Sequence, residues 1–284
     1  MSQIEEKLKA KTCFGTLALG ENYRSLAKLL SKDIEQYSPS TPMVILTDKP
    51  QEFSDFSNVL AFKHKQQSVG CYHDKRCVIA KGLSLFDACI FLDADIRILA
   101  PIEQTLEWSP GITAHIVWTN ILKHNKNQYQ LNLLSKMAQK LTLNLEEISF
   151  VHEAIFVVAK DSGKELDFLN QWDKIAPYFE LNGFYRGEGH TIGLAAAKAG
   201  LNIKRESLET LNFFKDKLEI QKIKRGQTSS EQIEEILNIQ KQNEYPYETL
   251  DKKVLKKLNK ILNRIYCTII LRYKTIKNFK FYYL

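Results

Sequence analysis

Two aspartates, Asp93 and Asp95, stand two residues apart directly after the apolar run Ala88–Leu92 (ACIFL). Carboxylates at this spacing can share one hard divalent cation, whose remaining positions are commonly filled by substrate phosphates. A cation held there neutralises a diphosphate and makes it a better leaving group. The pair therefore predicts a site for Mn²⁺ or Mg²⁺, with Asp93 and Asp95 as metal ligands. The alternative is that both carboxylates only cap a strand end and its turn.

The first 110 residues alternate strand and helix patterns, and this alternation decides where the aspartates lie. The predicted strands are 12–19, 43–47, 58–62 and 88–92, and the predicted helices are 22–37 and 75–85. The pattern indicates an α/β class, with an open and mostly parallel Rossmann-like sheet between flanking helices. Ligands of such sheets bind at the carboxyl ends of the strands. A single crevice is therefore expected to be lined by residues 17–23, Asp48 and 93–95.

The later part of the chain has a less regular pattern. Strands are predicted at 112–119 and 149–158, and helices at 127–140, 164–175, 189–200, 230–243 and 249–270. The polar stretch 222–230 (KIKRGQTSS) predicts the end of a catalytic body. The expected organisation is a catalytic domain over 1–221 and a helical C-terminal extension over 222–284.

Composition and charge exclude several classes of protein. The chain has 284 residues, of which 44% are hydrophobic, so wholesale disorder is excluded. Five scattered cysteines contain no CxxC pair, so neither a disulfide framework nor a thiolate zinc site is indicated. There is no apolar leader and no apolar run long enough to span a bilayer, which favours a cytoplasmic protein. The net charge of +7 resides in the tail, so nucleic acid is not the expected partner.

The aspartate pair and its surroundings resemble the glycosyltransferases of the GT-A fold, whose DxD motif holds the metal of a nucleotide-sugar. Gly20-Glu21-Asn22-Tyr23 is similar to the nucleotide-contacting turn of the glycogenin and galactosyltransferase-like retaining families. Lys75-Arg76 stand where similar enzymes place a basic residue that reaches the donor. The donor contacts expected in the crevice are Leu17, Ala18, Asn22, Tyr23, Asp48, Lys75, Arg76, Asp93 and Ala94. For Lys75 and Arg76 the alternative is an ordinary solvated helix start, and for Asp48 it is a strand cap.

A second resemblance lies downstream, to the blood-group-type transferases. His152-Glu153-Ala154-Ile155-Phe156 is similar to their HAAIF segment, and Glu188-Gly189-His190 to their Glu-Ser-His. The resemblance implies that Glu188 stabilises or attacks the anomeric centre, by the chemistry that glycosidases also use. His152, Glu153 and His190 complete the expected catalytic set. The alternatives are a core histidine at 152, a solvated Glu153, and polar groups of a helix N-terminus at 188 and 190.

The resemblance is incomplete, because the late His-x-x-Gly-x-x-Lys motif that supplies a third metal ligand in the glycogenin-like families does not occur in this sequence. It implies a metal-dependent enzyme that moves a sugar from a nucleotide-diphosphate donor, with UDP favoured, to a glycan or lipid-linked acceptor. Retention of the anomeric configuration is the favoured outcome. The alternatives are a phosphatase of the haloacid dehalogenase type and a non-catalytic module that binds anionic surfaces.

The last 33 residues form a basic tail. Residues 252–284 contain ten lysines and arginines and no acidic residue, and leucine and isoleucine recur at 255, 258, 262, 265 and 269. The 3, 4, 3, 4 spacing predicts a basic amphipathic helix. Such a helix can bind an anionic membrane, pack its apolar face on the body, or contact nucleic acid. The first alternative gives a peripheral position on the inner face of the membrane, which suits a lipid-linked acceptor.

Overall fold

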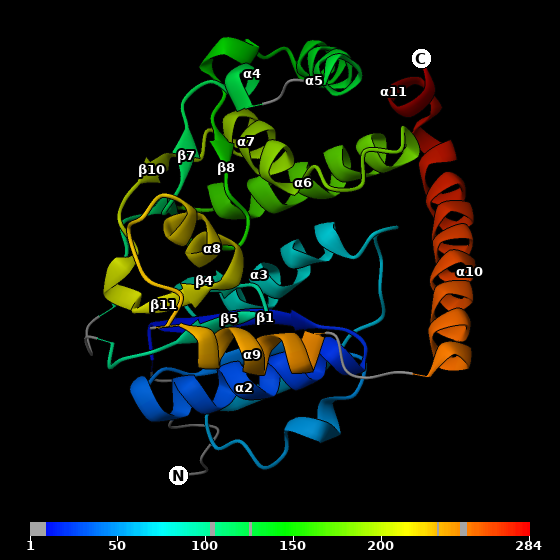
Figure 1. Cartoon of the computed structure of the whole chain (residues 1–284). Coiled ribbons are helices and arrows are strands. Elements are labelled where there is room, and N and C mark those ends of the chain that lie inside the picture. The colour runs from blue at the N-terminus through cyan, green and yellow to red at the C-terminus, as the bar shows by residue number, and fades with distance from the viewer. Residues whose placement is uncertain (1–9, 103–105, 125–126, 232, 245–248) are drawn as a thin grey trace.

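A seven-stranded sheet forms the centre of the computed structural model, which describes residues 10–102, 106–124, 127–231, 233–244 and 249–284 (Figure 1). The strand order is β10–β6–β9–β4–β1–β2–β3. β9 runs antiparallel to β4 and β6, whereas the other pairings within this sheet are parallel. The strands are β1 (Thr12–Ala18), β2 (Met43–Thr47), β3 (Val59–Lys63), β4 (Ala88–Leu92), β6 (Gly111–Ala114), β9 (Ile155–Ala159) and β10 (Ile203–Arg205). The predicted α/β class with a mostly parallel sheet is confirmed.

Two of the predicted strands are each divided in the structure. The predicted strand 112–119 is divided into β6 and β7 (Val117–Trp118), and 149–158 is divided into β8 (Phe150–Val151) and β9. β7 and β8 pair with each other in a separate two-stranded sheet. The prediction of continuous strands was wrong because apolar patterning does not show where a chain leaves one sheet for another. As a result, residues 152–154 form a turn at the edge of the main sheet instead of a strand interior.

Helices cover both faces of the main sheet. They are α2 (Glu21–Tyr37), α3 (Lys75–Leu83), α4 (Ile121–His124), α5 (Gln128–Leu141), α6 (Lys164–Leu181), α7 (Glu188–Ala199), α8 (Asp216–Lys224), α9 (Glu234–Glu244), α10 (Leu250–Thr275) and α11 (Phe279–Tyr283). α2 lies on one face with α9 beside it, and α3, α6 and α7 lie on the other (Figure 1). Two apolar clusters fill these layers, one centred on Leu26, Leu30 and Ile34 of α2 and the other on Trp172 and Phe179 of α6.

The predicted helices occur in the structure with shifted ends. The helix predicted over 164–175 continues to Leu181 because Tyr178 and Phe179 extend its buried face. The helix predicted over 230–243 corresponds to α9, and residue 232 lies outside the described residues. The polar stretch predicted to end the catalytic body is preceded and partly occupied by α8.

A short antiparallel pairing between two segments far apart in the chain was not predicted. β11 (Phe213–Lys215) runs antiparallel to β5 (Ile96–Ile98), with Lys215 opposite Ile96. Each strand has only three residues, which is too short for a periodic signal. The pairing brings the segment at 213–215 beside the aspartates that precede β5. The division of the chain at residue 221 stays a prediction.

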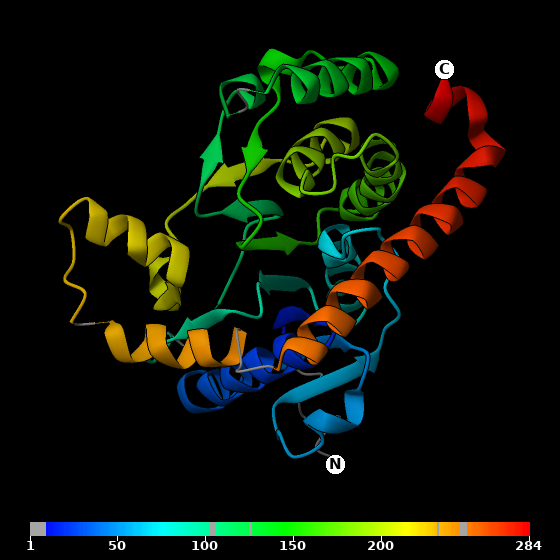
Figure 2. The same cartoon turned by 45° about the vertical axis from the view of Figure 1, so that its right-hand side comes forward.

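α10 lies at the side of the body and ends near α6, as both views show (Figures 1 and 2). Its residues 251–266 are all exposed. Within the described ranges, no helix combines the length and the apolar character needed to cross a bilayer.

Candidate functional site

The carboxyl ends of β1, β2 and β4 meet at one edge of the sheet, because these strands are parallel neighbours. β9 begins at the same edge, since Ile155 pairs with Leu92 in the antiparallel ladder. The backbone N–H of Asp93 donates to the carbonyl oxygen of Ala154 at 2.9 Å. The two segments that carry the aspartate pair and the 152–154 turn are therefore hydrogen-bonded to each other.

Two lysine ammonium groups form ion pairs with the aspartates. Nζ of Lys75 lies 2.9 Å from Oδ1 of Asp93. Nζ of Lys215 lies 3.6 Å from Oδ2 of Asp93 and donates a hydrogen bond to Oδ1 of Asp95. The lysine side chains are 8% and 6% exposed, whereas those of Asp93 and Asp95 are 26% and 16% exposed. The carboxylates are thus the solvent-facing part of the cluster, and both converge on the Lys215 ammonium.

Glu188 joins this cluster from the N-terminal turn of α7. Its Oε1 lies 3.5 Å from Nζ of Lys75, and the residue is only 3% exposed. Gly189 and Gly193 let α7 pack directly against the backbone of residues 149–151. A Cβ at Gly189 would collide with the carbonyl oxygen of Val151, and a Cβ at Gly193 with that of Ser149. Among the described residues, Oε2 of Glu188 has no hydrogen-bond partner. This carboxylate oxygen is therefore both buried and unpaired.

The electrostatics of the cluster follow from burial and from opposite charges at short range. Burial raises the pKa of Glu188 to about 7, although the Lys75 ammonium acts in the other direction. Burial also opposes ionisation of Asp93, but Lys75 and Lys215 hold its pKa below the ordinary value. Burial lowers the pKa of Lys75, and the carboxylates of Asp93 and Glu188 outweigh this effect and raise it. Lys75 and Asp93 therefore remain a charged pair at neutral pH.

Lys75 is placed by the loop that precedes α3. The carboxylate of Asp74 accepts hydrogen bonds from the backbone N–H groups of Gln67 and Ser68 and lies 2.8 Å from Nε2 of His64. The Lys75 ammonium in turn donates to the carbonyl oxygen of Glu153 at 3.1 Å. The loop thus fixes the start of the helix, and the helix directs the ammonium at the aspartates.

The other residues of the expected catalytic set have different surroundings. The backbone N–H of His152 donates to the carbonyl oxygen of Ile116, and burial lowers the pKa of its imidazole. Glu153 contributes its carbonyl to Lys75. The His190 ring packs edge-on against Phe150 and Phe184, with ring centroids 4.9 and 5.4 Å apart, in an aromatic environment.

The residues expected to contact the donor differ in exposure and in whether they already have a partner. Asn22 and Tyr23 lie in the first turn of α2, which follows β1, and Tyr23 is 53% exposed. Leu17 is half-buried, and Ala18 and Ala94 are buried. Asp48, at the end of β2, is engaged by the Arg24 guanidinium at 2.7 Å and by the backbone N–H of Gly20 at 3.1 Å.

Arg76 is directed away from the aspartates. Its Nε donates to Oδ1 of Asp173 on α6 at 2.8 Å, and its Nη1 donates to the carbonyl oxygen of His73. Lys75 and Arg76 are adjacent in sequence, yet of the two only Lys75 contacts the aspartate pair. The helical geometry separates successive side chains by about 100°, which explains the difference.

The sequence did not identify two residues that touch the aspartate pair. Lys215 arrives through the pairing of β11 with β5, and the side-chain amide of Gln240 on α9 donates to the carbonyl oxygen of Asp95. The same helix ends beside Asn22, whose side-chain amide donates to the carbonyl of Glu244 at 2.6 Å. These partners lie 120 to 222 residues away along the chain, so no local signal could have identified them.

The oxygen donors present fit a hard divalent cation. Asp93 and Asp95 each direct an oxygen at the same ammonium group, which is the convergence that a shared cation requires. No group of three histidine, cysteine, aspartate or glutamate side chains suited to a metal occurs in the described part of the chain. The remaining positions would therefore come from substrate phosphate and water. A metal would also compete with Lys215 for the carboxylates.

Comparison with protein-family models and with curated proteins finds no match for this chain. The geometry of the carboxylate and lysine cluster is therefore the feature of this chain that bears on function.

Proposed function

We propose that the chain is a metal-dependent glycosyltransferase of the GT-A type, which transfers a sugar from a nucleotide-diphosphate donor to a glycan or lipid-linked acceptor. UDP is the favoured nucleotide. The observation that carries the proposal is the meeting of Asp93, Asp95, Lys75, Lys215 and Glu188 at the carboxyl edge of a mostly parallel sheet. This edge is where such sheets bind their ligands. Its partly exposed carboxylates above buried cations suit a diphosphate with its metal.

Asp93 and Asp95 would hold Mn²⁺ or Mg²⁺. When bound, the cation neutralises the diphosphate and stabilises it as a leaving group. Lys215 lies within reach of both carboxylates, so it would exchange its contact with Asp95 for a donor phosphate oxygen. The exchange keeps the ammonium paired, which matters because an unpaired buried charge is costly.

Glu188 would act on the sugar. Its Oε2, which is buried and unpaired, would turn to the anomeric carbon, where a carboxylate stabilises positive charge or attacks to form a glycosyl-enzyme. Lys75 holds the other oxygen and so orients the group. In the overall reaction, the bond from the anomeric carbon to the diphosphate oxygen breaks and its electron pair leaves with the diphosphate. The acceptor hydroxyl oxygen then forms the new bond to the anomeric carbon and displaces Glu188 where a glycosyl-enzyme has formed, so that the carboxylate is regenerated. The acceptor proton passes to the departing diphosphate. Retention of configuration belongs to this proposal.

The decisive experiment is a thermal-shift titration of the full chain with UDP-, GDP- and CMP-sugars, each with and without Mn²⁺. A ligand at roughly 100 times its Kd adds about 2.7 kcal/mol, which corresponds to a Tm shift of roughly 5 to 10 °C. We expect a Mn²⁺-dependent shift with one class of nucleotide. Asp93→Asn and Asp95→Asn should abolish it.

Asp173→Asn is the matched control, because this aspartate is also ion-paired but lies with Arg76 on the side of α6. It should keep the shift. Absence of any Mn²⁺-dependent shift with the wild-type chain would overturn the proposal, and so would a shift that survives in both Asp93→Asn and Asp95→Asn.

A further inference from the structure

The apolar side chains of α10 face solvent instead of the body. Five of them, at 3 and 4 residue spacing, form what we call the outward stripe, and each is between 52% and 63% exposed: Leu255, Leu258, Leu262, Ile265 and Ile269. Val254 and Ile261 widen this surface and are 58% and 47% exposed. Single exposed apolar residues need no explanation, but a contiguous exposed patch indicates an interaction site.

The opposite side of α10 holds the helix on the body. Cys267 and Leu271 are buried in a small cluster with Val69, and Asn263 donates to the side chain of Gln66 at 2.8 Å. At about 100° per residue, Leu271 points roughly 200° away from Ile269. The body contacts therefore leave the outward stripe uncovered. The amphipathic pattern alone also allowed the stripe to pack on the body, but α10 packs there through its other face.

Charge identifies what the outward stripe would contact. Residues 252–284 carry ten basic side chains and no acidic one. A second copy of the chain would bring an equally positive helix against the first, at an electrostatic cost. An anionic lipid surface offers the complementary charge together with an apolar interior.

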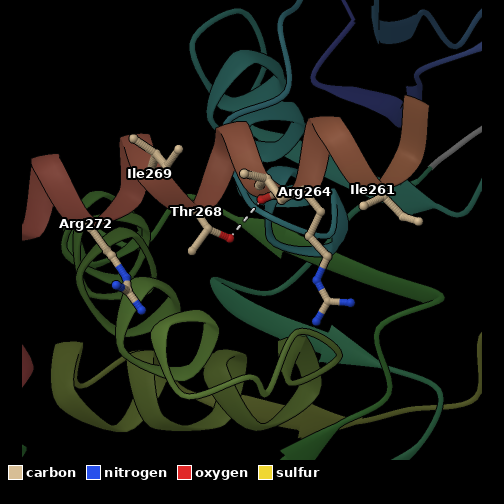
Figure 3. Close-up of a pocket in the computed structure, with 6 residues that line it drawn as sticks. Ile261, Arg264, Thr268, Ile269 and Arg272 are labelled. Atoms are coloured by element: carbon tan, nitrogen blue, oxygen red, sulfur yellow. Dashed lines mark hydrogen bonds between the residues drawn. The ribbon is translucent and has the colours of Figure 1, made fainter. Parts of the chain in front are cut away.

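A groove on α10 combines both kinds of contact (Figure 3). It has a volume of about 310 Å³ and is lined by Ile261, Arg264, Ile265, Thr268, Ile269 and Arg272. The guanidinium groups of Arg264 and Arg272 project to the same side of the helix (Figure 3). The Arg264 group also stacks on the Tyr185 ring of the body, 4.2 Å from the ring centroid, which leaves the N–H groups on its edge for phosphate. Guanidinium groups hydrogen-bond phosphate, and isoleucine side chains contact acyl chains.

We propose that α10 lies in the interface of an anionic membrane, with the outward stripe inserted among the acyl chains and the lysines and arginines at the phosphates. Lys253, Lys257 and Lys260 reach the phosphates along their flexible stems. The inner face of the helix stays on the body, so the whole chain is held at the membrane surface. Membrane binding in this form needs neither donor nor acceptor, and its outcome is independent of the proposed enzyme activity.

The test is flotation of the full chain with vesicles, in the absence of nucleotide. We expect binding to phosphatidylcholine vesicles that contain roughly 30 mol% phosphatidylglycerol, weak binding to pure phosphatidylcholine, and a loss of binding between about 0.1 M and about 1 M salt. Leu258→Gln/Leu262→Gln should weaken the partition at least tenfold, because glutamine keeps the helix but cannot be inserted. Leu99→Gln/Leu166→Gln removes two exposed leucines elsewhere and should bind as wild type.

Charge is tested in the same assay. Lys253→Gln/Lys257→Gln/Lys260→Gln should weaken binding at least tenfold, whereas Lys123→Gln/Lys136→Gln/Lys204→Gln, with equal loss of exposed charge, should not. Equal binding to neutral and anionic vesicles, or wild-type binding by the Leu258→Gln/Leu262→Gln variant, would overturn the proposal. A dimer in solution that this variant abolishes, without vesicle binding by the wild type, would assign the stripe to a second copy instead.

Discussion

Nζ of Lys75 lies 3.5 Å from Oε1 of Glu188, and each residue stands at the first position of its helix, α3 or α7. The same ammonium lies 2.9 Å from Asp93. One buried cation therefore connects the proposed metal ligand with the proposed catalytic carboxylate. Each carboxylate can be substituted while the other keeps Lys75 as its partner, so the two roles can be tested separately.

Glu188→Gln is expected to separate donor binding from turnover. The amide keeps the shape of the side chain but can neither attack nor stabilise an oxocarbenium-like centre as a carboxylate does. With the donor identified by the thermal-shift titration, we expect kcat to fall by about 100-fold or more and the donor Kd to change by less than about threefold. Glu165→Gln is the control, since this buried glutamate accepts two backbone N–H groups at the start of α6. Turnover near the wild-type rate would remove Glu188 from the chemistry.

Lys215→Met is expected to increase the affinity for Mn²⁺ in the absence of donor. The Lys215 ammonium lies on both carboxylates that would bind the metal, so metal and lysine compete. Removal of the positive charge should lower the Mn²⁺ Kd by about tenfold or more, as measured by titration calorimetry. In Lys164→Met, which loses an exposed ion pair with Asp161, the Mn²⁺ Kd should stay as in the wild type. An unchanged Kd in Lys215→Met would mean that the metal does not use these carboxylates.

Lys75→Met is expected to destabilise the fold strongly. It leaves Asp93 and Glu188 without their shared cation in a buried site, and breaking a buried pair in this way typically costs about 3 to 5 kcal/mol. Chemical denaturation measures the loss. The double variant Lys75→Met/Glu188→Gln should recover part of it, because one unpaired charge is removed. If the double variant is no more stable than Lys75→Met, the contact between the two residues does not contribute to stability.

Glu180 is expected to make stability depend on pH. Burial raises the pKa of its carboxyl to about 7 from an ordinary 4.5, although the N–H groups of Val69 and Gly70 donate to it. The folded state therefore binds a proton that the unfolded state loses, and this contribution to stability is present below about pH 4.5 and is lost as the pH rises through about 7.

Glu180→Gln keeps the acceptor and removes the titration. The free energy of unfolding of the variant should match that of the wild type near pH 4.5. Above about pH 7 it should exceed the wild-type value by on the order of 3 kcal/mol. The difference between the two unfolding curves is the appropriate measurement, because His73, whose pKa burial lowers to about 3, gives the wild type an opposite slope in acid. A difference that does not change with pH would contradict the assignment.

Local sequence determined most of the elements. Continuous apolar runs identified β1, β2 and β4, and helical periodicity identified α2, α5, α7 and α10, because each pattern needs only neighbouring residues to bury one face. Parallel strands joined by crossovers also made the carboxyl edge predictable, and with it the positions of Asp93 and Asp95, whereas Lys75 was expected there from the family resemblance. Both aspartates follow a strand whose end the fold class alone brings to that edge.

Tertiary structure decided which side chains reach that edge. Lys215 reaches Asp95, 120 residues away in the chain, through the three-residue pairing of β11 with β5. Arg76 pairs with Asp173 although it is the neighbour of Lys75 in the sequence. Tertiary packing also left the outward stripe of α10 in solvent, whereas its pattern alone was also compatible with a face packed on the body. Local propensity acts over a few residues, whereas these contacts depend on which distant segments share the available surface. That competition for surface is settled only when the whole chain packs.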